Sequence, residues 1–284
     1  MKIQNVAIIY RDQTPRAQSL AEELCTWLKN KKLNVFFQKD KSTHKDGMTI
    51  ETPEQLKNLQ LVVVLGGDGT YLEAVRFLGD QQVPVLGINL GSLGFLTENR
   101  VDEVYEVLEA TLQGKMKQVP LALLSVEVKA PQPQKFIALN DIVIERGQST
   151  HLLNVGMYWD GDLVTETKAD GMIISSPTGS TAYNLAAGGP ILQPEVHAIV
   201  ATPICSHSLT SRPIIFPDNK VLSVRILGQN RSGILSIDGQ RRAEINEKCE
   251  ILIQRHKLEH IVLRKTSHNF FSLLREKLKF GERD

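Results

Sequence analysis

The sequence predicts a two-domain protein, α+β overall, in which an α/β domain is followed by an all-β domain of the β-sandwich type. Its 284 residues leave room for two ordinary domains. Over residues 1–119, apolar runs alternate with stretches of helical periodicity, whereas residues 120–264 hold many short apolar runs separated by turn residues. This change in the pattern of apolar residues sets the expected domain boundary near residue 119.

The expected strands of the first domain are continuous apolar runs without polar alternation. Because helices separate them, they indicate a parallel, Rossmann-like sheet covered on both faces. The polar region 38–57 is expected to be a loop with a weak helix, and Gly114 is expected to cap the last helix of this domain. Strands are predicted at 5–10, 33–37, 61–65 and 83–88, and helices at 14–31, 70–78 and 101–114.

Short strands follow one another in the second domain, which is typical of a packed all-β domain. A helical pattern interrupts them at 181–189, and a last helix is predicted at 268–280. The expected strands are 121–130, 135–146, 152–161, 162–169, 171–176, 197–204, 220–227, 233–239, 249–256 and 260–265.

Composition excludes several classes of function. The formal net charge of +1 gives no electrostatic reason to expect nucleic acid or a membrane surface as partner. The three cysteines are far apart and form no Cys-x-x-Cys pair, which disfavours a zinc ribbon and fits a reduced compartment. The first residues resemble a strand rather than a signal peptide, and no apolar segment approaches the ~20 residues of a membrane span. We therefore expect a cytoplasmic protein.

A glycine-rich turn follows the third apolar strand, in the stretch "LVVVLGGDGT" from Leu61 to Thr70. Glycines let the phosphates of a ligand approach the backbone, and a helix that begins after them points its N–H groups at an anion. Gly66, Gly67 and Gly69 fit this role, with Thr70 expected to lead the helix. The spacing matches neither the P-loop pattern nor the usual dinucleotide fingerprint.

Asp68 is the unusual member of this turn. A carboxylate beside phosphates repels them unless it holds a cation or accepts a proton from an attacking hydroxyl. The alternative is an ordinary tight turn after a strand, in which aspartate serves local hydrogen bonding. The position at the end of a buried parallel strand, where such sheets bind ligands, favours the ligand site.

The segment from Lys168 to Pro190 forms a second cluster. Its hydroxyl groups and the start of a short helix make a neutral pocket suited to ribose, amide or phosphate groups, and Tyr183 could stack on a base. The alternative is an ordinary capped helix with a buried tyrosine. Lys168 and Asp170 are by themselves more typical of a solvated surface pair than of ligand contacts.

Asn140 and Asp141 interrupt an apolar strand, where a polar pair lowers stability unless it is satisfied. They could bind adjacent ribose hydroxyls, or they could mark a β-bulge or the end of a strand. Cys205 and His207 have no convincing further ligands near them, so we identify no metal site in the protein.

Taken together, the sequence resembles the NAD kinase family. The matching motifs follow the family's order and cover nearly the whole chain, and the long segment at 170–190 is the most specific of them. "GGDGT" alone is shared with diacylglycerol-type lipid kinases and, loosely, with phosphofructokinases. The motifs are "GGDGT" (66–70), "NLGSLGFLTE" (89–98), "LNDIV" (139–143), "DGMIISSPTGSTAYNLAAGGP" (170–190), "SLTSRPIIFP" (208–217) and "SIDGQ" (236–240).

The resemblance implies an N-terminal α/β domain and a C-terminal β-sandwich, with the last helix (265–284) returning to the first domain. It implies transfer of the γ-phosphoryl group of ATP, with a divalent metal such as Mg²⁺, to the 2′-hydroxyl of the adenosine ribose of NAD, giving NADP. Some members accept inorganic polyphosphate, and members are typically homodimers or homotetramers that share part of the substrate site between subunits.

The resemblance also implies roles for individual residues. Asp68 is expected to be the catalytic base, with Gly66, Gly67, Gly69 and Thr70 around the phosphates of the donor. This chain has Asn-Asp at 140–141 where many members have Asn-Glu, and lysine at 168 where arginine is common in members that prefer NAD over NADH. The implied NAD contacts are Asp68, Gly69, Asn140, Asp141, His151, Lys168, Asp170, Thr181, Ala182, Tyr183, Asn184, Leu185, Ala186 and Gln240.

Two other functions remain open from the sequence. A lipid kinase uses the same glycine-rich turn, but it would need an apolar or basic surface that faces the membrane. The near-neutral composition gives no sign of such a surface. A non-catalytic NADP sensor would keep the fold without the chemistry. The intact Asp68 disfavours a sensor, because a sensor needs no base beside phosphate.

Overall fold

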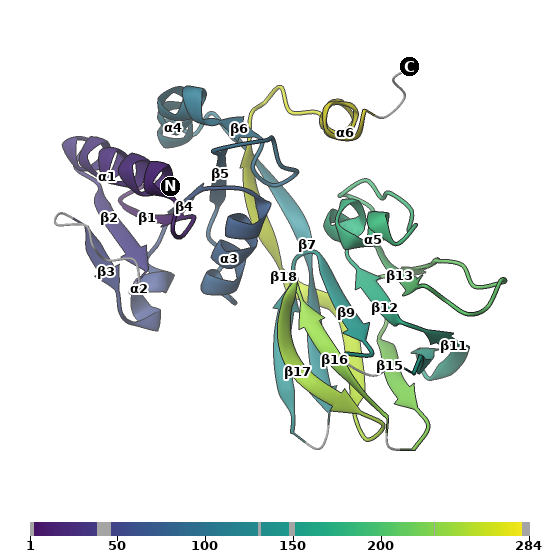
Figure 1. Ribbon diagram of the computed structural model, residues 1–284. Helices are drawn as coiled ribbons and strands as arrows, with labels where there is room; N and C mark the ends of the chain where they lie inside the picture. The colour runs from purple at the N-terminus through teal and green to yellow at the C-terminus, as the bar shows by residue number, and fades with distance from the viewer. Residues whose placement is uncertain (1–2, 39–46, 130–131, 148–150, 230, 280–284) are drawn as a thin grey trace. The chain divides into compact units, whose positions relative to one another are not determined.

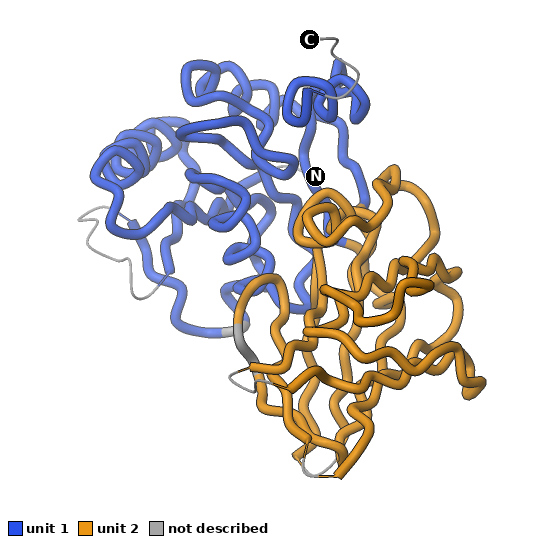
Figure 2. The backbone as a smooth tube through the Cα atoms, turned by 45° about the vertical axis from the view of Figure 1, so that its right-hand side comes forward, with its two compact units in different colours: residues 1–120, 260–284 blue, residues 121–259 orange. Residues whose placement is uncertain are grey.

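The strand that carries the glycine-rich turn, β4 (Leu61–Leu65), is buried along its whole length. It belongs to the first of two units into which the chain divides in the computed structural model, which describes residues 3–38, 47–129, 132–147, 151–229 and 231–279 (Figure 2). Unit 1 comprises residues 1–120 and 260–284, and unit 2 comprises residues 121–259. Among the described residues, no helix is long and apolar enough to cross a membrane.

Unit 1 is built on a parallel sheet, as the sequence predicts (Figure 1). Its strand order is β18–β5–β4–β1–β2–β3, every one of these pairs is parallel, and β6 pairs with β5. Strand β18 contributes the part from residue 260 onward. The other strands are β1 (Asn5–Tyr10), β2 (Asn34–Gln38), β3 (Met48–Ile50), β5 (Val85–Asn89) and β6 (Asn99–Arg100).

Helices cover both faces of this sheet. Helix α1 (Pro15–Asn30) buries Ala17, Ala21, Leu24, Cys25 and Leu28, a helical spacing that makes one apolar face. This face shares a core with α4 (Val104–Leu112) and with alternate residues of β1 and β4. The intervening residues of these strands point to the other face, toward which α3 (Asp68–Leu78) buries Tyr71 and Ala74.

Three details of unit 1 differ from the predictions. Region 38–57 contains the strand β3 as well as the helix α2 (Pro53–Lys57), while its residues 39–46 lie outside the described part. The predicted helix 101–114 begins with a 3₁₀ turn (Val101–Glu103) before α4, while Gly114 ends it with φ +71°, as expected of a capping glycine. The final helix α6 (Phe270–Leu278) begins two residues later than predicted. It starts after Asn269, whose side chain accepts the N–H groups of Phe271 and Ser272.

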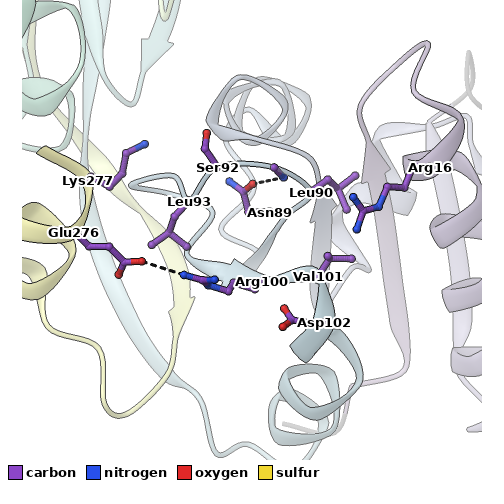
Figure 3. Close-up of a pocket in the computed structure, with 11 residues that line it drawn as sticks. Arg16, Asn89, Leu90, Ser92, Leu93, Arg100, Val101, Asp102, Glu276 and Lys277 are labelled. Atoms are coloured by element: carbon purple, nitrogen blue, oxygen red, sulfur yellow. Dashed lines mark hydrogen bonds and ion pairs between the residues drawn. The ribbon is translucent and has the colours of Figure 1, made fainter.

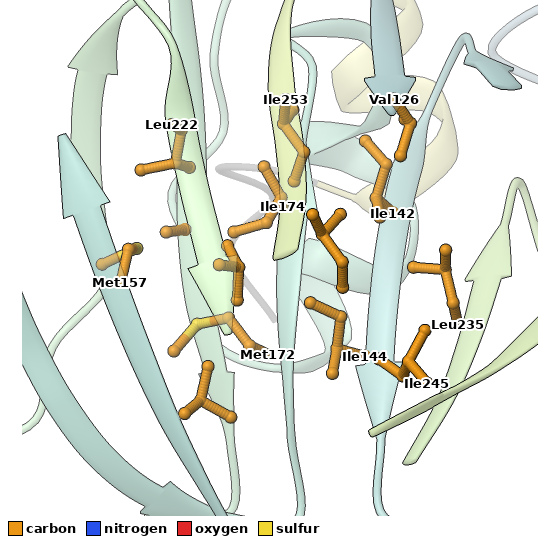
Figure 4. Close-up of a cluster of buried hydrophobic side chains, with 14 of the residues drawn as sticks. Val126, Ile142, Ile144, Met157, Met172, Ile174, Leu222, Leu235, Ile245 and Ile253 are labelled. Atoms are coloured by element: carbon orange, nitrogen blue, oxygen red, sulfur yellow. The ribbon is translucent and has the colours of Figure 1, made fainter. Parts of the chain in front are cut away.

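Unit 2 consists of two antiparallel sheets around one apolar core (Figure 4). One sheet has the order β11–β10–β15–β18, with β7 paired to β18 and to β8; the other has the order β14–β13–β12–β9–β16–β17. The strands are β7 (Lys117–Lys129), β8 (Gln134–Ala138), β9 (Asp141–Glu145), β10 (Leu153–Trp159), β11 (Asp162–Ala169), β12 (Gly171–Ser175), β13 (Ala198–Ile204), β14 (Ile214–Pro217), β15 (Leu222–Leu227), β16 (Ser232–Ile237), β17 (Gln240–Asn246) and β18 (Glu250–Arg264).

The β-sandwich prediction is confirmed, but three of its strand assignments are wrong. The predicted strand 135–146 is two strands, because the chain leaves one sheet after Ala138 and enters the other at Asp141. The two strands predicted at 249–256 and 260–265 form one continuous strand, β18. Strands β14 and β17 were not predicted: both lie at the edges of their sheet, and most residues of β17 are polar.

Candidate active site

The glycine-rich turn lies at the carboxyl end of the parallel sheet of unit 1. The N–H of Gly66 donates to the carbonyl of Ile88 at 3.0 Å, so the turn begins beside the end of β5. Gly67 is the N-terminal cap of α3, and the helix begins at Asp68, two residues before the predicted Thr70. The first N–H groups of a helix have no intrahelical acceptor, so this end of α3 is suited to an anion.

The three glycines serve the turn by leaving room, not by their φ angles. None of the three has a positive φ, so other residues could adopt their backbone conformation. A side chain at Gly66 would overlap the side chain of Thr70, which lies back against the turn. A Cβ at Gly67 or Gly69 would meet no atom within 4 Å, which leaves their backbone open to a ligand.

Four hydrogen bonds fix the carboxylate of Asp68. Its Oδ2 accepts the N–H of Phe95 at 2.8 Å. Its Oδ1 accepts the N–H groups of Leu96 and Thr97 at 3.1 and 3.0 Å and the Thr97 hydroxyl at 2.9 Å. Since a carboxylate has about four lone-pair sites, Oδ2 with its single donor is the oxygen that keeps capacity to accept a proton.

The loop that holds Asp68 is the part of the site that the sequence analysis gave no role. Thr97 is fully buried, and its hydroxyl also accepts the side-chain amide of Asn89 at 2.8 Å. A side chain at Gly94 would overlap both the Asp68 carboxylate and the Thr97 hydroxyl. The motif "NLGSLGFLTE" contains these residues, but the pairing with a carboxylate 27 to 29 residues earlier is a tertiary contact.

A buried pair lies behind the turn. The hydroxyl of Tyr71, the third residue after Asp68, is 2.8 Å from Nε2 of His260, and the two rings meet edge to face. Burial lowers the pKa of His260 to about 3 and raises the pKa of Tyr71 well above its usual value. Both groups are therefore neutral at physiological pH, and they anchor α3 to β18 within unit 1.

A pocket of about 780 Å³ lies at the end of β5, along the same loop (Figure 3). Its charged lining comprises Arg16, Arg100 and Lys277 together with Asp102 and Glu276, and Arg100 donates to Glu276 at 3.2 Å. The buried Asn89 links the pocket to Thr97 and so to the Asp68 network. A ligand in this pocket would therefore contact the loop that positions the carboxylate.

In unit 2, the predicted pair Asn140 and Asp141 lies where the chain passes from one sheet to the other, so the alternative of a strand end is correct for the backbone. Asp238 organises this crossing, because its carboxylate accepts the N–H groups of Leu139, Asn140 and Asp141 at 2.9, 2.8 and 3.2 Å. Burial, and then the charge of Asp238, raises the pKa of Asp141 to about 7.

The segment after β12 packs directly on this crossing. The N–H of Ser176 donates to the carbonyl of Asn140 at 2.9 Å, and its hydroxyl donates to the carbonyl of Leu139 at 2.5 Å. Gly179 is required here, since a side chain would overlap the carbonyl of Asn140. The structure thus brings the predicted segments 139–141 and 175–181 together within unit 2.

The predicted helix 181–189 is shorter than expected and is built from a 3₁₀ turn (Thr178–Thr181) and α5 (Tyr183–Ala186). Asn184 is fully buried, and protein atoms use its whole amide: Nδ2 donates to Ser180 and Pro190, and Oδ1 accepts the hydroxyl of Thr202. Tyr183 is 41% exposed, which differs from the buried tyrosine of the alternative interpretation. Thr181, Ala182 and Leu185 are half-buried, and Ala186 is exposed.

Four other predicted NAD contacts, Asp170, Lys168, His151 and Gln240, lie on or beside other strands of unit 2. Asp170 lies at the end of β9 and β12 opposite to Asp141, about 17 Å along the strand, and its carboxylate pairs with Arg146 at 2.8 Å rather than with Lys168. Lys168 is exposed on β11. His151 and Gln240 are also exposed, His151 before β10 and Gln240 at the first position of β17. The residue that the sequence analysis missed here is Arg146.

The structure gives no protein-built metal centre within its described residues, where no group of three or more His, Cys, Asp or Glu side chains could hold a metal ion. Cys25, Cys205 and Cys249 are all free thiols.

The chain is a two-domain protein in which an α/β unit carries a glycine-rich turn of the phosphate-binding type and a second unit consists of two antiparallel sheets. Comparisons with known proteins identify the family. The family model of the ATP-NAD kinase N-terminal domain matches residues 6–116, and that of the ATP-NAD kinase C-terminal domain matches residues 139–263. The chain belongs to the NAD kinase family.

Relatives match over the full length. The NAD kinase of Bdellovibrio bacteriovorus is 44% identical over 99% of this chain and 93% of its own, and that of Geobacter metallireducens is 39% identical over 99% of this chain and all of its own. The crystal structure of yeast NADH kinase complexed with NADH is similar with a TM-score of 0.92 and 31% identity, covering 100% of this chain and 90% of that chain. An Archaeoglobus fulgidus NAD kinase in complex with ATP shares the fold, with a TM-score of 0.73, 23% identity and coverage of 97% of this chain and 99% of that chain.

Proposed function

We propose that the protein is an NAD kinase that transfers the γ-phosphoryl group of ATP to the 2′-hydroxyl of the adenosine ribose of NAD, giving NADP and ADP. The observation that carries this proposal is the fixed carboxylate of Asp68, which begins a helix between Gly67 and Gly69, two glycines with open space beside their backbone. Family membership and the full-length relatives support the same reaction.

In the proposed reaction, the ribose 2′-oxygen attacks the γ-phosphorus, the bond from that phosphorus to the oxygen that bridges to the β-phosphate breaks, and ADP leaves. The hydroxyl proton passes to Oδ2 of Asp68, the oxygen with one hydrogen-bond donor. Because phosphoryl transfer depends mainly on positioning and electrostatics, a base held by four hydrogen bonds is well suited to it.

We propose that the phosphates of ATP bind at the backbone of Gly66, Gly67 and Gly69 and at the N-terminal end of α3, beside Thr70. The open space at Gly67 and Gly69 and the unpaired N–H groups of the helix start support this assignment. Inorganic polyphosphate, which offers the same oxygen atoms, is the alternative donor.

For NAD, we propose contacts from unit 2 in addition to Asp68 and Gly69. Asn140 and Asp141 would bind ribose hydroxyls, and the half-exposed ring of Tyr183 would stack on a base. Asn184 would act indirectly, because its side-chain amide already bonds to other protein atoms and so fixes the conformation of the segment around it. The remaining proposed contacts are His151, Lys168, Asp170, Thr181, Ala182, Leu185, Ala186 and Gln240.

The divalent cation expected of the family, Mg²⁺, has no cluster of side-chain ligands in the described part of the chain. Asp68 already accepts four hydrogen bonds. The side chains therefore do not form a site for the ion by themselves, and we assign it no protein ligand. A cation that enters with ATP would take its ligands from phosphate oxygens and water.

We also propose a homodimer or homotetramer in the cytoplasm. The exposed apolar side chains of Leu163, Leu209 and Ile215 in unit 2, which are 56%, 94% and 50% exposed, support an interface between subunits. The three free thiols fit a reducing compartment. Light scattering on the purified protein measures the number of subunits.

The function is tested by incubating the protein with Mg²⁺ and either ATP or polyphosphate, and with NAD, NADH or diacylglycerol as acceptor. NADP from NAD and ATP is the expected product. Product from the lipid alone would make the protein a lipid kinase, and NADP binding without any turnover would make it a sensor.

A further inference from the structure

Arg264 is a buried cation at the end of β18, only 3% exposed. A buried guanidinium is unfavourable unless its donors are paired. Both of its terminal nitrogens reach the same short segment of unit 1: Nη1 donates to Oε2 of Glu98 at 3.0 Å, and Nη2 donates to the carbonyl of Phe95 at 3.2 Å. Arg264 therefore holds the two ends of segment 95–98.

The inner part of this segment holds the proposed base. The N–H groups of Phe95, Leu96 and Thr97 all donate to Asp68. The carbonyl of Phe95 and the side chain of Glu98 accept hydrogen bonds from Arg264. Phe95 thus joins the two groups directly, with its N–H on Asp68 and its carbonyl on Arg264. A shift of the segment would move the carboxylate with it.

Stability alone does not explain this arrangement. Within the described residues, Nε of Arg264 and Oε1 of Glu98 are buried without a hydrogen-bond partner. Apolar residues often replace a buried ion pair with no loss of stability, or with a gain. The ion pair therefore leaves two buried polar atoms without partners, which lowers its contribution to stability. Its two hydrogen bonds still fix Phe95 and Glu98 in place. His268 closes it from the other side through contacts with both Glu98 and Arg264.

We propose that Arg264 is a positioning residue for Asp68: it acts through Phe95 and Glu98 and fixes the carboxylate at the place where the substrate proton is accepted. This inference rests on the proposed function. A misplacement of about 1 Å at a reacting group lowers a rate by as much as ~100-fold, so the clamp should appear in kcat rather than in substrate affinity.

The test compares Arg264→Met, Arg264→Lys and the control Arg225→Gln, which removes a half-exposed surface ion pair with Glu250 in unit 2. We expect Arg264→Met to lower kcat about 10- to 100-fold, with the KM for NAD changed by less than about threefold. Lysine keeps the charge but not the forked donors, so Arg264→Lys should recover part of the loss. The control should keep the wild-type kcat.

A double-mutant cycle separates positioning from general damage. In the Asp68→Asn background, Arg264→Met should lower the residual rate by less than about twofold, because the two residues act as one unit. A loss equal to that in the wild-type background, or a folded Arg264→Met variant with the wild-type kcat, would overturn the proposal. If Arg264→Met does not fold, Glu98→Gln, which removes the charge that faces Arg264, takes its place with the same expected results.

Amide hydrogen exchange tests the clamp without reference to activity. In Arg264→Met or Glu98→Gln, the N–H groups of Phe95, Leu96 and Thr97 should exchange at least about 10-fold faster, while the N–H groups of β1 keep their rates. Unchanged exchange at 95–97 would refute the clamp even if NADP is formed. Faster exchange without NADP formation in the wild type would instead refute the proposed function alone.

Discussion

The carboxylate of Asp238 accepts the N–H of Asn140 at 2.8 Å, and it also accepts the N–H groups of the residues on either side. Asp68 does the same in unit 1 with the successive N–H groups of residues 95–97. In each unit, one carboxylate thus accepts three consecutive backbone N–H groups of a segment that belongs to the proposed site. In unit 1 the carboxylate is the proposed reacting group, and in unit 2 it positions the proposed ribose contacts.

Replacing Asp238 should therefore weaken both folding and NAD binding. Asp238→Asn removes the charge and replaces one carboxylate oxygen by an amide NH2 group, which donates and cannot accept. At least one buried N–H therefore loses its partner. We expect the free energy of unfolding to fall by about 1–3 kcal/mol and the KM for NAD to rise. Urea unfolding and steady-state kinetics measure the two effects. Asp160→Asn, at the exposed ion pair with Lys220, is the control and should stay within about 0.5 kcal/mol of the wild type.

Asp141 should make stability depend on pH. Burial and the charge of Asp238 raise its pKa from 3.8 to about 7, so between these values the folded chain binds more protons than the unfolded chain. Its contribution to stability is therefore fully present below pH 4 and is lost as pH rises toward 7. Asp141→Asn should gain at least about 1 kcal/mol relative to the wild type between pH 5 and pH 8. A difference that is independent of pH in denaturant titrations would contradict this assignment.

The buried His260 should have the opposite pH dependence. Its pKa is lowered to about 3, so the unfolded chain takes up the proton first, and stability is fully present above pH 6.5 and is lost as pH falls. Tyr71→Phe leaves Nε2 of His260 without its partner and should lower the free energy of unfolding by about 1–3 kcal/mol at pH 7.5. Tyr158→Phe, in unit 2, is the matched control, and equal losses in the two variants would argue against the pair.

Gly94 should tolerate no side chain, because a Cβ there would overlap the Asp68 carboxylate and the Thr97 hydroxyl. We expect Gly94→Ala to lower kcat by as much as ~100-fold through displacement of the carboxylate. In the same loop, a Cβ at Gly91 would have its nearest neighbour at 3.9 Å, so Gly91→Ala should retain most of the activity. Similar kinetics for the two variants would show that the loop adapts and does not fix Asp68.

The sequence predicted the two-domain fold and the turn around Asp68, because both depend on local patterns: buried apolar strands, helical spacing and glycines at a strand end. It did not predict the partners of the two carboxylates. Asp68 meets residues 27 to 29 positions away, and Asp238 meets residues nearly 100 positions away, so only the folded chain joins them. The sequence left the crossing at Asn140 open between ribose contacts, a β-bulge and a strand end, because a polar pair between two apolar runs fits all three.

The most direct test of the central claim is NADP formation by Asp68→Asn, measured with NAD affinity on the same preparation. Asparagine keeps the size of the side chain and one oxygen for the N–H groups of Leu96 and Thr97. Its NH2 group cannot accept the N–H of Phe95, and it cannot take up the proton of the 2′-hydroxyl. We expect turnover to fall about 10²- to 10⁴-fold, to a small residual rate, while the Kd for NAD stays within a few-fold of the wild type. Turnover at a rate close to that of the wild type would contradict the assignment of Asp68 as the base.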